Sequence, residues 1–299
     1  MRGIRYCFYT FLLTILCLGT AQAQTLFGLV GDGQDSPSDL YLINTNTGAA
    51  TFIGPTGFEH CGGMDFDVLS GKLVATCQRN DGSDIGVLVE INPLTGNGTE
   101  IGPLGCDRST DISFRHSDNV LFGALFGGCP FGLNTINVNT GSANFLGSFS
   151  LSGCCGNGMA FSIADVLFTA NDIALDILDQ SDGSVISSII LSYPPPADDF
   201  PRINAMDVNP TTGVMFASVV EGNGQQGTNV NFLATVDLDS GVVTIIDETA
   251  DGLDAIAFAE EVDFTRPIPT LSEIGLIASA LVLFAAAIFT LRRRKAHQS

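Results

Sequence analysis

Residues 40–48 read LYLINTNTG, and residues 88–96 read LVEINPLTG. In both stretches apolar and polar residues alternate, a short polar stretch follows, and glycine comes last. Alternation with a period of two indicates a strand with one buried face, and the closing glycine indicates a tight turn. A second alternating stretch follows each glycine, at 50–54 and at 99–102. Each copy therefore predicts a β-hairpin.

The hairpin pattern is a repeat. Further copies lie at 133–141, 175–183 and 233–241. The closing glycines of the five copies are Gly48, Gly96, Gly141, Gly183 and Gly241. Successive glycines are 48, 45, 42 and 58 residues apart. A period of about 45 residues is typical of the blades of a β-propeller.

A second hairpin precedes each of the later copies. These hairpins span 64–75, 112–122, 159–168 and 206–217. Two hairpins per period give four strands, which is the size of a propeller blade. The inner strands carry a stripe of large apolar residues that we expect to be core: Met64, Phe66, Ile112, Phe114, Met159, Phe161, Met206, Val208, Ile256 and Phe258.

The first repeat unit lacks an inner strand, because residues 26–30 read as a second strand. Residues 255–258 match the inner-strand pattern and have no partner strands after them. They would complete the first blade and close the ring, which leaves no unprotected sheet edge at the seam. We therefore predict an all-β protein with a five-bladed propeller of four-stranded blades over residues 24–264.

The long step of 58 residues contains the stretch YPPPADD at 193–199. Proline cannot donate to a strand ladder, so an inserted surface loop is favoured there over another blade. A six-bladed ring and an irregular β-solenoid are the alternatives.

The N-terminus predicts export. Arg2 and Arg5 precede an apolar stretch at 6–18, and residues 21–23 read AQA. This order of features is typical of a secretory signal peptide. We expect residues 1–23 to be removed, so that the mature chain begins at Gln24.

The C-terminus predicts a membrane anchor. Residues 274–291 are 18 uncharged and mostly apolar residues, just enough for a helix to cross a bilayer. The tail at 292–299 is basic and should remain in the cytoplasm, which places the rest of the chain outside. Its cations are Arg292, Arg293, Arg294 and Lys295. We expect a single-pass protein in the cell envelope or at the cell surface.

Residues 265–273 link the propeller to this helix, and residues 268–275 read IPTLSEIG. Motif, apolar helix and arginine cluster together resemble the IPTL-CTERM protein-sorting tail of Gram-negative bacteria. That tail is similar to the PEP-CTERM signals handled by exosortase-type membrane transpeptidases. The family usually has tryptophan where this chain has Ile274. The motif residues are Ile268, Pro269, Thr270, Leu271, Ser272, Glu273 and Gly275.

The resemblance covers about a tenth of the chain. It implies an exosortase-type transpeptidase as a partner, cleavage near the motif and transfer to a surface carrier.

The chain has a formal net charge of −20. The two terminal segments hold six of the 12 basic residues but one of the 32 acidic residues, so the remainder has a net charge of −25. Such a surface repels nucleic acids and anionic lipid headgroups, so neither is expected as a partner of this part. Solubility outside the cell, or binding of divalent cations or cationic partners, fits this charge.

Six cysteines remain after the signal peptide: Cys61, Cys77, Cys106, Cys129, Cys154 and Cys155. An even number in an exported chain predicts disulfides. Cys61 and Cys77 lie symmetrically about one inner-hairpin turn, and Cys106 and Cys129 about the next. Each pair could therefore bridge its own hairpin. Cys154 and Cys155 could pair with each other or with a neighbour; metal binding is the alternative for all six.

The mature domain lacks H-E-x-x-H, G-x-S-x-G and P-loop motifs, and the whole chain lacks tryptophan. We predict no catalytic residues. The favoured function is a non-enzymatic binding or scaffold module with an unknown protein or glycan partner. The alternatives are a hydrolase or lyase with its site at the channel mouth, and a calcium-stabilised envelope protein.

Two weak ligand sites follow from the repeat. The polar residues that begin the inner strands could hold Ca²⁺ or a small polar ligand, or could merely line a wet channel. They are Thr110, Asn157, Asn204 and Asp254. Asp237 and Asp239 resemble a short Ca²⁺ loop, although an Asx turn explains them equally well. Ca²⁺ is thus the one candidate cofactor.

Overall fold

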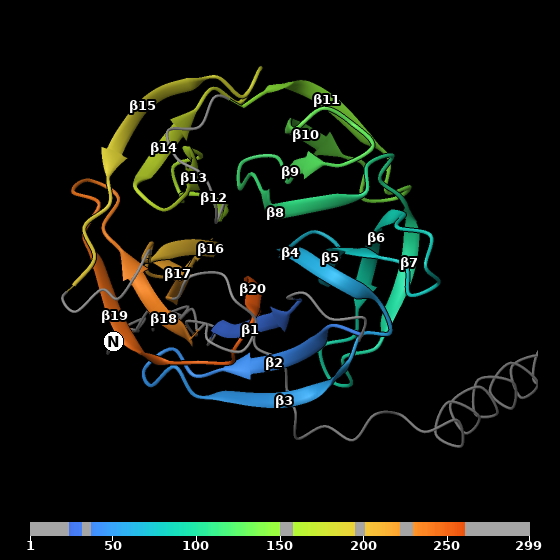
Figure 1. Ribbon diagram of the computed structural model, residues 1–299, viewed down its shortest axis with the longest axis horizontal. Helices are drawn as coiled ribbons and strands as arrows, with labels where there is room; N and C mark the ends of the chain where they lie inside the picture. The colour runs from blue at the N-terminus through green and yellow to red at the C-terminus, as the bar shows by residue number, and fades with distance from the viewer. Residues whose placement is uncertain (1–23, 32–36, 150–157, 195–200, 222–229, 261–299) are drawn as a thin grey trace, which may run out of the picture. The chain divides into compact units, whose positions relative to one another are not determined.

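The computed structural model describes residues 24–31, 37–149, 158–194, 201–221 and 230–260. Its strands form five antiparallel four-stranded sheets arranged in a ring around a central axis (Figure 1). The region along this axis, which the inner strands face, is called the channel here. This confirms the all-β five-bladed propeller. The ring lies within a compact unit, Met1–Glu261; the second unit of the chain, Val262–Ser299, lies outside the described residues.

Each blade runs from an inner strand at the channel to an outer strand at the rim. Blade 1 contains β20 (Leu253–Glu260), β1 (Gln24–Val30), β2 (Asp39–Ile43) and β3 (Ala50–Pro55); blade 2 contains β4 (Glu59–Asp67), β5 (Lys72–Gln78), β6 (Gly86–Ile91) and β7 (Gly98–Pro103). Blade 3 contains β8 (Arg108–Phe114), β9 (Leu121–Phe126), β10 (Gly132–Ile136) and β11 (Ala143–Ser148); blade 4 contains β12 (Met159–Phe161), β13 (Leu167–Ala170), β14 (Ala174–Leu178) and β15 (Val185–Ile190). Blade 5 contains β16 (Arg202–Val208), β17 (Met215–Glu221), β18 (Val230–Val236) and β19 (Val243–Glu248).

The ring is closed within blade 1, as the sequence predicts. β20 pairs with β1 in antiparallel register, with Phe258 opposite Leu26 and Ile256 opposite Gly28. The last described strand of the chain therefore completes the blade that the first one begins.

The outer turn of each blade is an Asx turn. Asn44 Oδ1 accepts a hydrogen bond from the backbone N–H of Asn46 at 2.9 Å, and Gly48 donates its N–H to the carbonyl of Asn44. Gly48 has a φ of +68°, which a residue with a Cβ adopts only with strain. The same side chain to backbone bond recurs at Asn92, Asn137, Asp179 and Asp237. The repeated glycine is therefore a requirement of the turn.

The same glycine also sets the distance between blades. A Cβ on Gly96 of blade 2 would lie 2.3 Å from the carbonyl oxygen of Gly54 in β3. A Cβ on Gly141 of blade 3 would meet Gly102 of β7 in the same way, at 2.2 Å. The turn of one blade thus packs directly on the outer strand of the preceding blade.

The core lies between the sheets. The aromatic rings of Phe122 in blade 3 and Phe161 in blade 4 meet edge to face with centroids 5.2 Å apart. Phe216 in blade 5 and Phe258 in blade 1 repeat this contact at 5.1 Å. Edge-to-face packing of this kind adds to the burial of apolar area. The predicted apolar stripe is buried, except that Phe66 is half-buried.

Two disulfides each bridge the open end of an inner hairpin within one blade. Cys61 pairs with Cys77 in blade 2, and Cys106 pairs with Cys129 in blade 3. Both predicted pairings are confirmed. Cys154 and Cys155 lie outside the described residues. Disulfides form and persist mainly in oxidising compartments outside the cytoplasm.

The segments expected to direct export and anchoring lie outside the described residues: the signal peptide 1–23, the sorting motif 268–275, the helix 274–291 and the basic tail 292–299. Within the described part of the chain, no helix has the length and apolar character needed to cross a membrane.

Asp111 of β8 connects three blades across the channel. The inner strands have no further strand beside them, so their channel-facing N–H groups need other acceptors. Asp111 Oδ1 accepts from the N–H of Ile112 at 2.9 Å. Its Oδ2 accepts from Met159 in blade 4 at 2.9 Å and from Met206 in blade 5 at 3.2 Å. The side chain is fully buried, and burial raises the pKa of this carboxyl well above its usual range.

Small residues make room for Asp111. At the matching position of the other inner strands stand Gly63, Gly158, Ala205 and Ala255. A Cβ on Gly63 would lie 2.8 Å from the nitrogen of Ile112, and a Cβ on Gly158 would lie 2.8 Å from the carbonyl carbon of Ala205. One carboxyl group therefore fills a layer in which the other four strands have almost no side chain.

Replacing this carboxyl should destabilise the whole ring. In Asp111→Ala the buried N–H groups of Met159 and Met206 lose their acceptor, at roughly 1–3 kcal/mol each. Since each kcal/mol lowers Tm by roughly 2–4 °C in a domain of this size, we expect a fall of at least about 4 °C. Circular dichroism melts would measure it, with Asp239→Ala in an exposed turn as the control. Equal Tm values for the two variants would show that Asp111 does not bridge the blades.

Candidate functional site at the carboxylate end of the channel

The channel has two chemically different ends. Cys61 and Cys106 lie near the start of β4 and β8, so the end where the inner strands begin is called the disulfide end here. Asp65 and Asp207 lie near the other ends of β4 and β16, which define the carboxylate end. The turns of the inner hairpins surround the carboxylate end.

Five channel-facing N–H groups form a layer at the carboxylate end. They belong to Phe66, Phe114, Phe161, Val208 and Phe258, one from each inner strand. Three side chains from the preceding position of the repeat accept all five bonds: Asp65, Ser113 and Asp207.

Each aspartate in this layer serves two blades. Asp65 accepts from Phe66 of its own strand and from Phe114 of blade 3, both at 2.6 Å. Asp207 accepts from Val208 at 2.7 Å and from Phe258 of blade 1 at 2.6 Å. Of the other three inner strands, one has Ser113 at this position and two have alanine, which offers no acceptor. Two carboxyl groups therefore accept four of the five hydrogen bonds in this layer.

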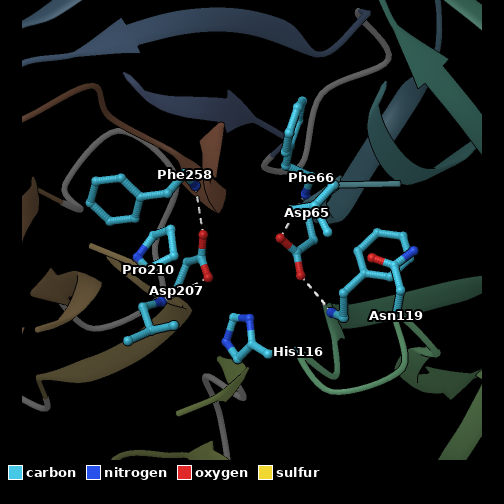
Figure 2. Close-up of a pocket in the computed structure, with 10 residues that line it drawn as sticks. Asp65, Phe66, His116, Asn119, Asp207, Pro210 and Phe258 are labelled. Carbon is cyan, nitrogen blue, oxygen red and sulfur yellow. Dashed lines mark hydrogen bonds between the residues drawn. The ribbon is translucent and has the colours of Figure 1, made fainter. Parts of the chain in front are cut away.

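A cavity of about 40 Å³ opens beside these carboxyl groups. Asp65 and Asp207 face it from different blades, with His116 on a third side (Figure 2). Asn119 also lines it and donates its amide to Asp67 at 2.7 Å. Pockets for small molecules usually measure roughly 300–1,000 Å³. This cavity has room for a few waters or for the end of one side chain.

The two carboxyl groups hold protons more tightly than usual. Burial raises the pKa of Asp65 to about 7, and the nearby charge of Asp67 adds to the rise. Burial also raises the pKa of Asp207 well above its usual range, and the charge of Asp65 raises it further. Among the described residues, the three ion pairs involve other carboxylates. A cation placed in this cavity would favour the ionised form of both carboxyl groups and so lower their pKa values.

Exposed apolar side chains lie at the same end of the ring as the cavity. They come from the turns of three inner hairpins, and we call them the apolar rim: Val68, Leu69, Ile163 and Val214. Leu69 is 80% exposed and Ile163 is 59% exposed. Val68 also lines the cavity, and Ile163 lies against Gly213 of the next turn. Apolar residues gathered on one face are a common mark of an interaction surface.

The sequence-predicted ligand residues lie at the opposite end of the channel. Asn204 Nδ2 donates to Asp254 Oδ1 at 3.0 Å, so the structure brings these two side chains together across blades 5 and 1. The hydroxyl oxygen of Thr110 is buried without a hydrogen-bond partner. Asn157 lies outside the described residues. Whether these residues hold a ligand stays a prediction.

The carboxylate of Asp237 takes part in its own turn. Its Oδ1 accepts from the N–H groups of Asp239 and Ser240 and from the hydroxyl of Ser240. This is the Asx turn that the other blades also form. The described part of the chain contains no cluster of three or more His, Cys, Asp or Glu side chains positioned to bind a metal ion.

Sequence reasoning missed the carboxylate end. Asp65 and Asp207 stand out only after the inner strands are aligned, since Ser113, Ala160 and Ala257 occupy the other three positions. The sequence signal that could have identified them is a carboxylate at a position of a buried strand where the other repeats have serine or alanine. Such a group must find hydrogen bonds because burial without them is costly.

No protein family matches the chain, and no curated protein matches it. Similar folds occur among solved structures. A chain from a nidogen/laminin complex is 13% identical, with a TM-score of 0.45, over 79% of this chain and 98% of that one. A periplasmic gluconolactonase of Pseudomonas aeruginosa is 13% identical, with a TM-score of 0.40, over 76% of this chain and 83% of that one. The architecture is taken from the strand pairing itself, and no function follows from these similarities.

The raised pKa values predict that stability falls as pH rises. An unfolded aspartate has a pKa near 3.9, so between roughly pH 4 and 7 the unfolded chain releases a proton that folded Asp65 retains, and the raised pKa of Asp207 acts in the same direction. This contribution is fully present below about pH 4 and is lost as pH rises through about 7. We expect a lower Tm at pH 8 than at pH 5, and a smaller difference in Asp65→Asn. Asp239→Asn should keep the full difference. A flat profile in the unmodified protein would contradict the assignment.

Proposed function

We propose that this chain is an exported, non-enzymatic binding module, and that its binding face is the carboxylate end of the propeller. The observation that carries the proposal is the small cavity between Asp65 and Asp207 within the apolar rim. Its size suits the end of a lysine or arginine side chain, and its two carboxyl groups have no cation among the described ion pairs. The partner is a protein segment with a basic residue flanked by apolar ones.

The apolar rim and the two carboxyl groups of the cavity both fit a basic side chain flanked by apolar ones. Apolar side chains of the partner would cover Leu69 and Ile163, and its cation would enter between the carboxyl groups. A buried ion pair repays its desolvation cost only when its geometry is good and its remaining hydrogen bonds are satisfied. Here both carboxylates already accept two backbone N–H groups each. The net charge of −25 between the two terminal segments would also steer a cationic partner towards the protein.

The two disulfides support a location outside the cytoplasm. We propose that residues 1–23 direct export and are removed. We further propose that the segment 268–299 acts first as a membrane anchor and then as the substrate of an exosortase-type transpeptidase. The propeller would then be displayed in the cell envelope or at the surface.

The alternative function is a hydrolase or lyase at the channel mouth. One observation favours it: Asp65, with a pKa of about 7, shares the cavity with His116, and groups that titrate near neutral pH are common in acid–base catalysis. The cavity would have to enlarge to admit a substrate. Turnover of a glycoside, lactone or phosphoester that is lost in Asp65→Asn would support this function over binding.

Selection from a displayed library of random peptides tests the binding face. We expect enrichment of sequences with one lysine or arginine flanked by large apolar residues. Leu69→Ser and Ile163→Ser should weaken binding of the enriched peptides by roughly tenfold, as expected when about 1.4 kcal/mol of contact is lost. Both residues are exposed, so the fold should be unaffected.

The matched control is Ile173→Ser, which changes an exposed isoleucine (52% exposed) at the disulfide end. It should leave peptide binding unchanged. Binding that is reduced by Ile173→Ser and not by the rim variants would place the interaction on the other face. Peptides without a basic residue would contradict the role of the cavity.

Intact mass spectrometry of the native protein tests whether the two terminal segments are removed as proposed. We expect a species that begins at Gln24 and ends near Thr270, with an added carrier group, in the surface fraction. A species that extends to Ser299 in the membrane fraction would instead indicate a plain anchor. Reduction should add the mass of two hydrogens for each disulfide, so Cys61–Cys77 and Cys106–Cys129 account for four.

A further inference from the structure

The two carboxyl groups beside the cavity have few lone pairs left for further partners. Each of the four oxygens of Asp65 and Asp207 already accepts a hydrogen bond from one backbone N–H group. A carboxyl group offers about four lone-pair positions, so about two remain on each side chain. The hydroxyl of Ser113 also bonds to Asp65 and takes a further position there. Any additional group, whether a proton or the cation of a partner, must bind at the positions that remain.

Both carboxyl groups line the same small cavity. Asp65 and Asp207 face it from blades 2 and 5, and both side chains are buried (Figure 2). Burial favours the neutral form of a carboxyl group, and the charge of a second carboxylate favours it further. Without a cation, the pair therefore retains protons. A cation reverses this preference because it stabilises the charged form.

The cations on neighbouring elements do not neutralise this pair. Lys72 of β5 forms an ion pair with Glu90. Arg115, in the turn that carries His116, forms an ion pair with Asp118. Among the described ion pairs, neither cation contacts a carboxyl group of the cavity. The place of a cation between the two aspartates is therefore left to a partner.

Asp67, Asp165 and His116 are the other titratable groups beside the cavity or its turns. Burial opposes the ionisation of Asp67, but hydrogen bonds from neighbouring groups outweigh it and lower the pKa of this carboxyl group. Asp165 of blade 4 accepts the backbone N–H of His116 at 2.8 Å, which holds that turn beside the cavity. A proton on the imidazole of His116 would add a positive charge at the cavity and oppose a second cation.

We propose that acid releases the basic partner: its cation enters the cavity in exchange for protons held by Asp65 and Asp207, and protons displace it again as pH falls. The exchanged protons pass to water. Both states use the same carboxyl groups and the same backbone N–H bonds, so the exchange requires no rearrangement of the blades. This inference rests on the proposed function and adds regulation to the same site.

The expected size of the effect follows from Asp65. Burial raises its pKa to about 7, so the group is mostly ionised at pH 8 and mostly protonated at pH 6. When only the ionised form accepts the cation, the apparent affinity falls by about tenfold over this interval. Asp207, whose pKa burial also raises, makes the fall larger. We therefore expect binding at pH 6 to be at least about tenfold weaker than at pH 8.

An NMR titration of the side-chain carboxyl carbons in the native protein tests the exchange. The probe is butylammonium chloride, which carries the same charged end as a lysine side chain. We expect it to lower the apparent pKa values of Asp65 and Asp207. Tetramethylammonium chloride at the same ionic strength is the control, since it has the same charge but no N–H to donate. Equal pKa values in the two salts would overturn the inference.

Peptides enriched on the binding face test the release itself. A peptide without histidine, aspartate or glutamate keeps a constant charge between pH 6 and 8, so a change in its affinity reports on the propeller. Its affinity should fall at least about tenfold between pH 8 and pH 6. In Asp65→Asn the fall should be smaller, because one exchanging group is gone. Asp239→Asn, in an exposed turn, is the matched control and should keep the full fall.

The outcomes separate this inference from the function on which it rests. A peptide that binds equally at both pH values would overturn the release by acid and leave the binding face intact. The same holds for a fall that is undiminished in Asp65→Asn, since other groups would then be responsible. Failure to enrich any basic peptide at pH 8 would remove the binding face, and this inference with it.

Discussion

Ring closure around a channel leaves the inner edge of every blade without a strand partner, and the fold depends on how those backbone N–H groups find acceptors. In this chain three buried carboxyl groups accept most of the described hydrogen bonds that these inner-strand N–H groups donate. Asp111 connects blades 3, 4 and 5 in one layer, while Asp65 and Asp207 connect blades 2 with 3 and 5 with 1 in the next. Because carboxyl groups are costly to bury, they come with raised pKa values and a small polar cavity. The candidate site is thus a by-product of the way the blades are joined.

At the outer strands, neighbouring blades are held together by glycine-containing turns and not by buried carboxyl groups. Each outer turn needs a glycine for its backbone conformation, and the same glycine lets that turn approach the neighbouring outer strand, as at Gly96 and Gly141. One residue in each repeat therefore fixes both the hairpin and the spacing of the blades. The inner and outer contacts together hold adjacent sheets at the separation that the large apolar side chains between them require.

The sequence was enough to predict the fold because the repeat contains its own turn signals. Gly48 and its four equivalents give the period, and the unpartnered stretch at 255–258 predicts the closing strand. Symmetry about the hairpin turns allowed the disulfide pairs Cys61–Cys77 and Cys106–Cys129, which the structure contains, but it left other pairings open. The site was not predictable in the same way, since Asp65 and Asp207 acquire their properties from neighbours about 50 residues away, Phe114 and Phe258. Alignment of the repeats places residues at the same level, but it does not reveal which side chain reaches across to the next blade.

Both disulfides lie within blades, whereas the seam of the ring in blade 1 has no covalent link among its described residues. β1 is the first described strand to be synthesised, yet its inner neighbour β20 is the last. Blades 2 and 3 can therefore fold and oxidise in chain order, while blade 1 waits for its final strand. Such a long-range contact makes the last step of folding slow and leaves the edge of β1 open until then. The order of synthesis thus makes blade 1 the part of the molecule most dependent on protection while the chain folds.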